Sequence, residues 1–150
     1  SSTNRSLERA LHLLLVLESI GAPQSLTELA SATQLSKPTV QRILGVLERY
    51  CLVDKRLGRY HLGVAVLPLA HAYLLGNSLS RAALPALQEL ASATGETASL
   101  FVRLGYHRVV VHRVEGSQPL RYVLPIGQRL PLHIGVGKVL AAAMAKEELS

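Results

Sequence analysis

The spacing of apolar residues predicts two helices at the start of the chain. In residues 6–20 they recur at i, i+3, i+4 and i+7, which indicates an amphipathic helix with Ser6 as its candidate N-cap. The predicted core face of this helix consists of Leu7, Ala10, Leu11, Leu14 and Leu17. The Gly-Ala-Pro run at 21–23 ends it. Ser25 and Glu28 then form a candidate capping box, in which each side chain satisfies the other's backbone amide, so a second, short helix is expected to begin here.

A third helix is expected from Ser36, its candidate N-cap, to about Tyr50. Pro38 fits this helix because it falls in the first turn, where its missing N–H has no intrahelical acceptor. The apolar face consists of Val40, Ile43, Leu44 and Leu47, and the opposite face carries Pro38, Arg42, Gly45 and Arg49, flanked by Thr39 and Gln41. Residues 53–55 and 60–62 then alternate with period 2 about a turn at 57–58, which predicts a β-hairpin.

The pattern changes after Gly63. Residues 64–75 are apolar on nearly every side, which predicts a buried helix. It could pack on its own domain or pair with a second copy of the chain, and we favour pairing. A further helix is expected at 79–94, with Gly95 as its C-cap and a kink or break at Pro85. Its apolar stripe consists of Leu84, Leu87, Leu90 and Ala91.

The remaining third of the chain predicts an antiparallel sheet. Strands are expected at 97–104, 108–114 and 120–124, joined by turns that contain glycine. Residues 127–131 are expected to form a loop, and residues 136–145 a last helix. Helices followed by an antiparallel meander place the chain in the α+β class.

Composition excludes several classes of protein. Of the 150 residues, 49% are hydrophobic and 17% are charged, which is typical of a folded domain and not of a disordered chain. A single cysteine, Cys51, cannot build a disulfide framework and is expected to be a small buried residue. The longest apolar stretch covers 15 residues, whereas spanning a bilayer takes about 20. No signal-peptide pattern opens the chain, so we expect a cytoplasmic protein without a membrane partner.

The basic residues are concentrated in one window. The formal net charge is +6, and residues 1–62 and 63–150 each carry eight basic and five acidic side chains. Between Lys37 and Arg59, however, six basic residues face two acidic ones, which gives +4 over 23 residues. This window spans the third helix and the hairpin, and such a basic patch favours nucleic acid as a partner.

Three short helices followed by a basic hairpin predict a winged helix-turn-helix. The major groove of DNA accepts one helix, and short polar side chains near the start of that helix can contact phosphates or base edges. The arginines of the hairpin are placed to contact the backbone or the minor groove. The predicted DNA-binding residues are Ser36, Lys37, Pro38, Thr39, Gln41, Arg42, Gly45, Arg49, Arg56 and Arg59.

Several motifs in order along the chain resemble the IclR family of bacterial transcriptional regulators. They are Ser6-Leu7-Glu8-Arg9-Ala10-Leu11, Ser25-Leu26-Thr27-Glu28-Leu29-Ala30, Leu35-Ser36-Lys37-Pro38-Thr39-Val40-Gln41-Arg42-Ile43-Leu44, Arg59-Tyr60-His61-Leu62-Gly63, Gly95-Glu96-Thr97-Ala98-Ser99-Leu100, and Leu130-Pro131-Leu132-His133 with Gly137-Lys138. No single motif is decisive, but together they cover nearly the whole chain.

The resemblance implies a division into three parts. These are a winged helix-turn-helix DNA-binding domain at 1–62, a linker and dimerisation helix at 63–78, and the first part of a GAF-like effector-sensing domain at 79–150. It also implies a homodimer, often paired into a tetramer, that binds a palindromic operator in double-stranded DNA. The effector pocket would lie between the sheet and the last helix, and the candidate effector-binding residues are Leu132, His133, Gly135 and Gly137.

Other classes of function find little support in the residues. The Gly135–Lys138 segment lacks the first glycine of a phosphate-binding loop, and no catalytic residue or cofactor is predicted. The candidate metal ligands His112 and Glu115 fall on opposite faces of a strand, so no metal site is predicted. We expect a ligand-responsive DNA-binding regulator. The alternative is a small-molecule-sensing adaptor whose winged helix contacts a protein.

Overall fold

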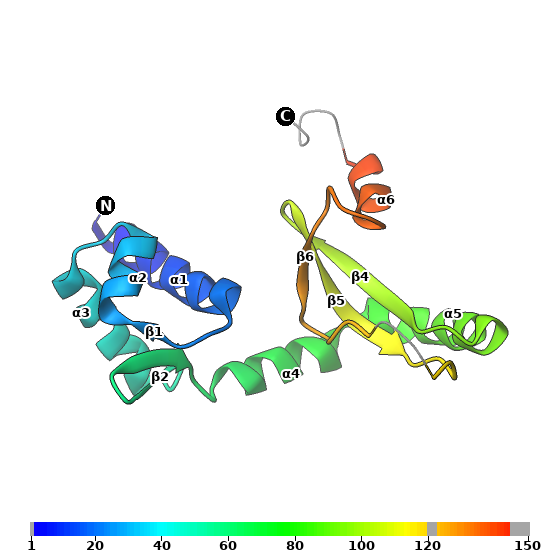
Figure 1. The fold of residues 1–150 in the computed structure, drawn as a ribbon, viewed down its shortest axis with the longest axis horizontal. Helices are drawn as coiled ribbons and strands as arrows, with labels where there is room; N and C mark the ends of the chain where they lie inside the picture. The colour runs from blue at the N-terminus through cyan, green and yellow to red at the C-terminus, as the bar shows by residue number, and fades with distance from the viewer. Residues whose placement is uncertain (1, 120–122, 145–150) are drawn as a thin grey trace. The chain divides into compact units, whose positions relative to one another are not determined.

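A computed structural model describes residues 2–119 and 123–144 of the chain. The chain forms two compact units, Ser1–Tyr73 and Leu74–Ser150, and the division falls inside a helix (Figure 1). The first unit combines helices with a small sheet, and the second combines helices with an antiparallel sheet. The predicted α+β class is therefore confirmed. Among the described helices, none is long and apolar enough to cross a bilayer.

The first unit is built on helix α1, Ser2–Ile20. The prediction that Ser6 caps this helix is wrong, because the helix already begins at Ser2. The predicted core face is also rotated: Leu13 is completely buried, whereas Leu7 and Leu11 are 59% and 52% exposed. Leu17 is buried as predicted. The i, i+4 pair Leu13 and Leu17 therefore defines the side of α1 that meets the other helices.

Helices α2, Leu26–Thr33, and α3, Lys37–Arg49, follow as predicted. The capping box at the start of α2 is present: the Ser25 backbone N–H donates to Glu28 Oε2 at 2.6 Å, and the Glu28 N–H donates to Ser25 Oγ at 3.2 Å. Gln34 ends α2 in the left-handed region with φ 55. The four predicted core positions of α3, Val40, Ile43, Leu44 and Leu47, are all buried in one cluster with Leu13, Leu17 and Leu29.

The predicted hairpin is confirmed as strands β2, Val53–Arg56, and β3, Arg59–Leu62. A third strand that the sequence analysis missed, β1, Gln24–Ser25, pairs with β3, so the sheet order is β1-β3-β2. The two-residue connection has φ 50 at Leu57 and φ 77 at Gly58. Positive φ at both positions is the signature of a type I′ turn, and a leucine in this region carries strain of about 1–2 kcal/mol.

Helix α4, Val66–Gly76, is the apolar helix that the sequence predicts. None of its residues is buried in the single chain, and Leu67, Leu69 and Leu75 are each about two-thirds exposed (64%, 65% and 64%). The described residues of the same chain therefore do not cover the helix, and pairing with a second copy stays a prediction. The expectation that Cys51 is buried is wrong, since this cysteine is exposed.

Helix α5, Ser78–Thr94, opens the second unit after α4. The Asn77 side chain accepts hydrogen bonds from the N–H groups of Leu79 and Ser80, and Gly95 ends the helix with φ 72 as predicted. Pro85 lies inside a continuous helix, so of the predicted kink or break the break is excluded. Leu90 is 55% exposed, and the stripe that packs inward is centred on Leu87 and Ala91.

The sheet of the second unit is antiparallel, as predicted, but its third strand is elsewhere. Strands β4, Ala98–Leu104, and β5, His107–Val114, pair along their length, and β6, Arg129–Pro131, pairs with the other edge of β5. The prediction of a loop at 127–131 is therefore wrong. Of the strand predicted at 120–124, residues 120–122 lie outside the described residues, and residues 123–124 are not in a strand.

The last helix, α6, Gly137–Ala142, is shorter than predicted. Its capping residue, Val136, lies just before it, and residues 143–144 follow it as irregular chain. Residue 145, the predicted last residue of this helix, lies outside the described residues.

The capping box of α2 predicts how stability depends on pH. The Ser25 backbone N–H, then the Ser25 hydroxyl, and also the Arg59 guanidinium hold the pKa of Glu28 below its ordinary value of 4.5. A lowered pKa in the folded state stabilises the fold above the unfolded pKa, and this contribution is lost as pH falls through the folded pKa.

We therefore expect the free energy of unfolding of Glu28→Gln to fall less steeply than that of the wild type as pH drops below about 4.5. Urea unfolding across a pH series measures this difference. Glu8→Gln, which removes an exposed carboxylate from α1, is the matched control and should keep the wild-type slope. Equal slopes for wild type and Glu28→Gln would show that the capping box carries no charge-dependent stability.

Candidate nucleic-acid interface

One face of α3 is turned to solvent and carries most of the predicted DNA-binding residues. Its exposed members are Ser36, Lys37, Pro38, Gln41, Arg42 and Arg49, and Thr39 and Gly45 are half-buried. This orientation follows from the opposite face, where Val40 and Leu44 are completely buried. Because the two faces point in opposite directions, burial of the apolar face in the core leaves the polar face exposed to solvent.

The cations on this face have no carboxylate partners within residues 2–119 and 123–144. Lys37, Arg42 and Arg49 make no ion pair or side-chain hydrogen bond there. The arginines of the hairpin differ, since Arg56 and Arg59 each meet a carboxylate. The positive charge of α3 is therefore available to an external anion, and phosphate contacts by such cations dominate affinity for DNA.

The start of α3 adds to this electrostatic character. Ser36 occupies the N-cap position, but its side chain caps no backbone amide, contrary to the prediction. Its hydroxyl instead lies 2.9 Å from the hydroxyl of Thr39. The first turn of the helix therefore keeps N–H groups without side-chain acceptors, and the N-terminal end of a helix dipole favours anions.

Gly45 lies in the middle of α3 with open space beside it. A Cβ built on this glycine meets no atom within 4 Å, leaving aside its chain neighbours and the helix backbone within four residues. Glycine in a helix interior costs about 1 kcal/mol relative to alanine. No packing contact among the described residues requires a glycine at this position.

Arg59 is part of the fold as well as of the predicted interface. Its Nη2 donates to both carboxylate oxygens of Glu28 at 3.2 and 2.9 Å, and its Nε donates to the Pro23 carbonyl at 3.2 Å. This arginine therefore ties strand β3 to the start of α2. Arg56 donates through Nε to Asp54 at 2.6 Å, and its side chain is 75% exposed. Both arginines are predicted DNA-binding residues, and the sequence does not predict these pairings.

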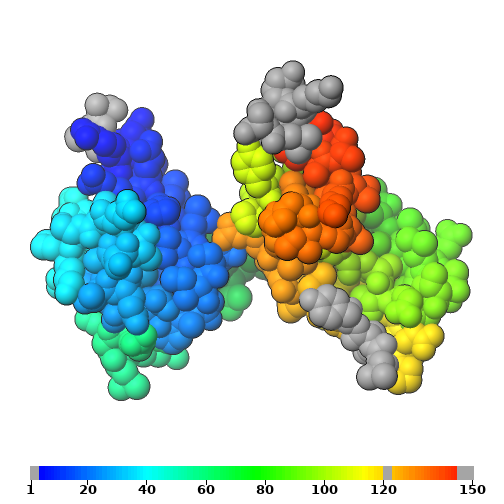
Figure 2. All heavy atoms as spheres, turned by 45° about the horizontal axis from the view of Figure 1, so that its top comes forward, coloured from blue at the N-terminus to red at the C-terminus, as the bar shows by residue number. Residues whose placement is uncertain are grey.

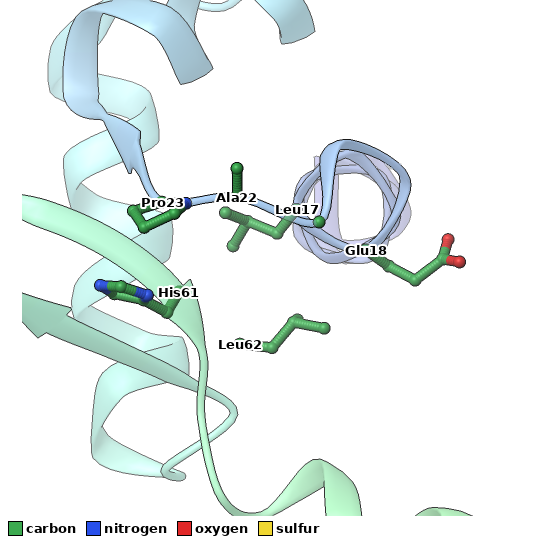
Figure 3. A pocket seen from close by; sticks show the side chains of 7 residues that line it. Leu17, Glu18, Ala22, Pro23, His61 and Leu62 are labelled. Carbon is green, nitrogen blue, oxygen red and sulfur yellow. The ribbon is translucent and has the colours of Figure 1, made fainter. Parts of the chain in front are cut away.

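A small pocket lies in the first unit beside the C-terminal ends of α1 and β3 (Figure 3). It has a volume of about 140 Å³ and is lined by Leu17, Glu18, Gly21, Ala22, Pro23, His61 and Leu62. The side chain of Glu18 extends away from the pocket in Figure 3, and the remaining lining is mostly apolar. Pockets for small-molecule ligands are typically about 300–1,000 Å³, so this pocket is too small for an effector.

The candidate effector-binding residues lie together between β6 and α6. Leu132 and Gly137 are buried, and His133 and Gly135 are exposed. A Cβ on Gly137 would lie 2.5 Å from the Leu132 carbonyl oxygen and 2.8 Å from Arg108 Nη1, so this position admits only glycine. Packing alone thus explains Gly137.

Arg108 is a buried neighbour of this segment that the sequence analysis did not identify. It is 7% exposed, lies 4.9 Å from the Phe101 ring centroid, and donates through Nη1 to the Ile134 carbonyl at 3.3 Å. The sequence around Arg108 does not indicate that this arginine is buried. The residues that enclose it belong to the paired strand and to the 132–137 segment.

Among the described residues, no three His, Cys, Asp or Glu side chains are grouped so that they could hold a metal ion. His112 and Glu115, the candidate ligands named from the sequence, therefore belong to no such group there.

Two family models match the chain, each over a different part of it. The IclR helix-turn-helix domain matches residues 6–56, and the bacterial transcriptional regulator IclR C-terminal domain matches residues 71–150. The chain is 33% identical over 148 residues to the HTH-type transcriptional repressor AllR of Escherichia coli strain K12. That match covers 97% of this chain and 55% of the repressor, so the chain spans about half the length of this relative.

Solved structures of related regulators share the fold. An IclR family transcriptional regulator from Brucella abortus has a TM-score of 0.85 at 28% identity, covering 96% of this chain and 55% of that one. An IclR homologue from Microbacterium hydrocarbonoxydans, complexed with 4-hydroxybenzoate, has a TM-score of 0.70 at 20% identity, covering 95% and 60%. The second likeness bears on the fold alone.

The open space at Gly45 yields a prediction in which stability and DNA binding move in opposite directions. Gly45→Ala should raise the free energy of unfolding by about 1 kcal/mol, because it removes the helix-propensity cost. Gly45→Leu should remain at least as stable as the wild type but lose about tenfold or more in affinity for DNA, since the larger side chain holds α3 away from the duplex.

Chemical denaturation and fluorescence anisotropy measure the two quantities. Ala82→Leu, at an exposed position of α5, is the control for adding a leucine to a helix surface. Full DNA affinity in Gly45→Leu would rule out close contact between this part of α3 and DNA.

Proposed function

Because the chain belongs to the IclR family of bacterial transcriptional regulators, we propose that it binds double-stranded DNA through the exposed face of α3. The observation that carries this proposal is a set of three cations, Lys37, Arg42 and Arg49, which pair with no carboxylate among the described residues and lie beside the open surface at Gly45. The protein acts in the cytoplasm as a regulator of transcription and carries out no chemical reaction.

The residues of α3 divide by the contacts they can make. Arg42 can reach guanine O6 and N7 with two hydrogen bonds, and Gln41 can bind adenine in the same way. Lys37, Ser36 and Thr39 at the helix start suit phosphate oxygens, where contacts fix the register of the protein on the duplex. Pro38 and Gly45 contribute shape rather than hydrogen bonds.

Arg56 and Arg59 extend the interface onto the hairpin, and Arg49 extends it along α3. Arg59 does so while bound to Glu28, which lowers the net charge that it offers to DNA. We therefore assign the larger electrostatic share to the cations of α3.

The apolar surface of α4 supports a homodimer. Leu67, Leu69 and Leu75 are exposed on a helix that carries no charged residue, and exposed apolar patches of this kind mark protein interfaces. A dimer with two-fold symmetry would present two copies of α3 to half-sites about 34 Å apart on a palindromic operator. Pairing of two such dimers would give a tetramer.

The second unit is proposed to begin an effector-sensing domain. The segment from Leu132 to Gly137 lies between the sheet and α6, and a homologue of the same fold is complexed with 4-hydroxybenzoate. A small-molecule effector would shift the population between arrangements of the dimer that bind the operator with different affinity, with α4 transmitting the change. The proposed division remains 1–62 for DNA binding, 63–78 for the linker and 79–150 for sensing.

Arg42→Ala tests the DNA-binding proposal most simply. Anisotropy titrations of the full-length protein against DNA from upstream of its own gene, across a salt series, should show log affinity falling linearly with log salt. The variant should weaken binding by about 1–3 kcal/mol and reduce discrimination against scrambled DNA. Arg81→Ala on α5 removes the same charge elsewhere and should leave both quantities unchanged.

Absence of binding to any genomic fragment at low salt would contradict the proposal. The protein would then be better described as the sensing adaptor, in which the winged helix contacts a protein.

Replacing Leu67, Leu69 and Leu75 together by Gln tests the dimer. Glutamine keeps helix propensity while removing the apolar surface, so we expect the dimer dissociation constant to rise by about tenfold or more. Analytical ultracentrifugation measures the constant. Leu104→Gln, an exposed leucine at the end of β4, is the control. An unchanged dimer in the triple variant would place the interface elsewhere.

A further inference from the structure

The tip of the β2–β3 hairpin combines full exposure with an unfavourable backbone conformation. Leu57 is 102% exposed and has φ 50. Asn, Asp and Gly are preferred at such a position because they tolerate positive φ. The leucine therefore does not stabilise the fold, either through its backbone conformation or through packing.

The two other non-glycine residues with positive φ in the described part of the chain have a local reason for it. Gln34 and Cys51 each follow a helix, and their N–H groups donate to the carbonyls of Ser31 and Glu48 at 3.2 and 2.9 Å. Left-handed residues of this kind are common at helix ends. Leu57 ends no helix. Single exposed leucines are ordinary, but one held in a strained turn indicates a partner outside the fold.

The surroundings of Leu57 have the charge that DNA requires. Lys55, whose ammonium lies 5.2 Å from the Tyr60 ring centroid, pairs with no carboxylate among the described residues. Asp54 engages the Nε of Arg56, whose side chain remains 75% exposed. Both cations come immediately before Leu57 in the chain, so they can contact DNA phosphates when the hairpin tip lies at a groove.

The hairpin is also a rigid element of the structure. Arg56 pairs with Arg59 across the two-residue turn, which fixes the position of Leu57 with no flexible loop. The hairpin packs beside α3, and its blue-green atoms project from the edge of the first unit in Figure 2. A protein that lays α3 in the major groove thus carries a stiff apolar tip on the same unit.

We propose that Leu57 is an apolar wedge that enters the minor groove next to the site read by α3 and partly unstacks one base step. This inference rests on the proposed DNA binding. Leucine is one of the side chains that act as such wedges and kink the duplex. Pyrimidine–purine steps unstack most readily, so Leu57 would select such a step without any hydrogen bond to a base.

Leu57→Asn tests the proposal because it separates folding from binding. Asparagine suits the positive φ, so we expect the melting temperature of the variant to rise. DNA affinity should fall by about tenfold, and the bend angle should fall too, because the wedge is lost. The salt slope should be unchanged, since no charge is altered. Leu57→Met keeps an apolar wedge and should retain most of the affinity and bend.

The probe is DNA selected from a random-sequence pool by the wild-type full-length protein. Anisotropy gives the affinity, and fluorescence energy transfer between the DNA ends gives the bend. If the more stable Leu57→Asn variant binds and bends this DNA like the wild type, the inference is overturned. Equal losses in Leu57→Asn and Leu57→Met also overturn it. If the wild type selects no DNA at all, the proposed function fails instead, and the inference fails with it.

Discussion

Burial of one face of α3 is the constraint on which the candidate interface depends. Val40 and Leu44 are completely buried against Leu13 and Leu29, which are themselves completely buried. Losing a leucine of this kind costs about 2–5 kcal/mol, so the helix cannot rotate about its axis without losing a large part of the stability of a small domain. The rotational setting of α3 therefore decides that Arg42 and Gly45 face outward. The chemistry of the surface is a consequence of the packing beneath it.

The hairpin is attached to this framework by polar contacts. Glu28 completes the capping box of α2 and at the same time accepts two hydrogen bonds from Arg59. Strand β1, which pairs with β3, contains the N-cap residue Ser25. One carboxylate thus links the start of the second helix to the hairpin. Its exposure makes the energetic contribution modest, but its position sets where the hairpin leaves the unit.

Much of the first unit could be predicted from the sequence because its signals are local. The capping box, the apolar face of α3 and the turn at 57–58 each lie within a few residues. The predictions are wrong where the interacting residues lie far apart in the sequence. The predicted core face of α1 contains Leu11, whereas the buried residue is Leu13. Both positions fit helical spacing, and only tertiary contacts distinguish them. Strand β1, with two residues, has no pattern of its own and exists because β3 lies beside it.

The same reasoning explains the errors about the candidate site and the second unit. That Arg59 would pair with Glu28, 31 residues away, has no signature in the sequence. Strand β6 was taken as loop because its three residues become a strand only by pairing with β5. The apolar surface of α4 is left uncovered by the described residues of its own chain, and its pairing with a second copy stays a prediction. An apolar pattern indicates that a surface avoids water but does not say which molecule covers it.

Methylation interference is the measurement that best tests whether α3 enters the major groove of DNA. Guanine N7 lies in the major groove, so its methylation blocks a helix placed there. With the full-length protein and DNA selected by it, we expect interference at two clusters of guanines about one helical turn, or a multiple of it, apart. Binding that is indifferent to guanine methylation throughout the protected region would contradict it.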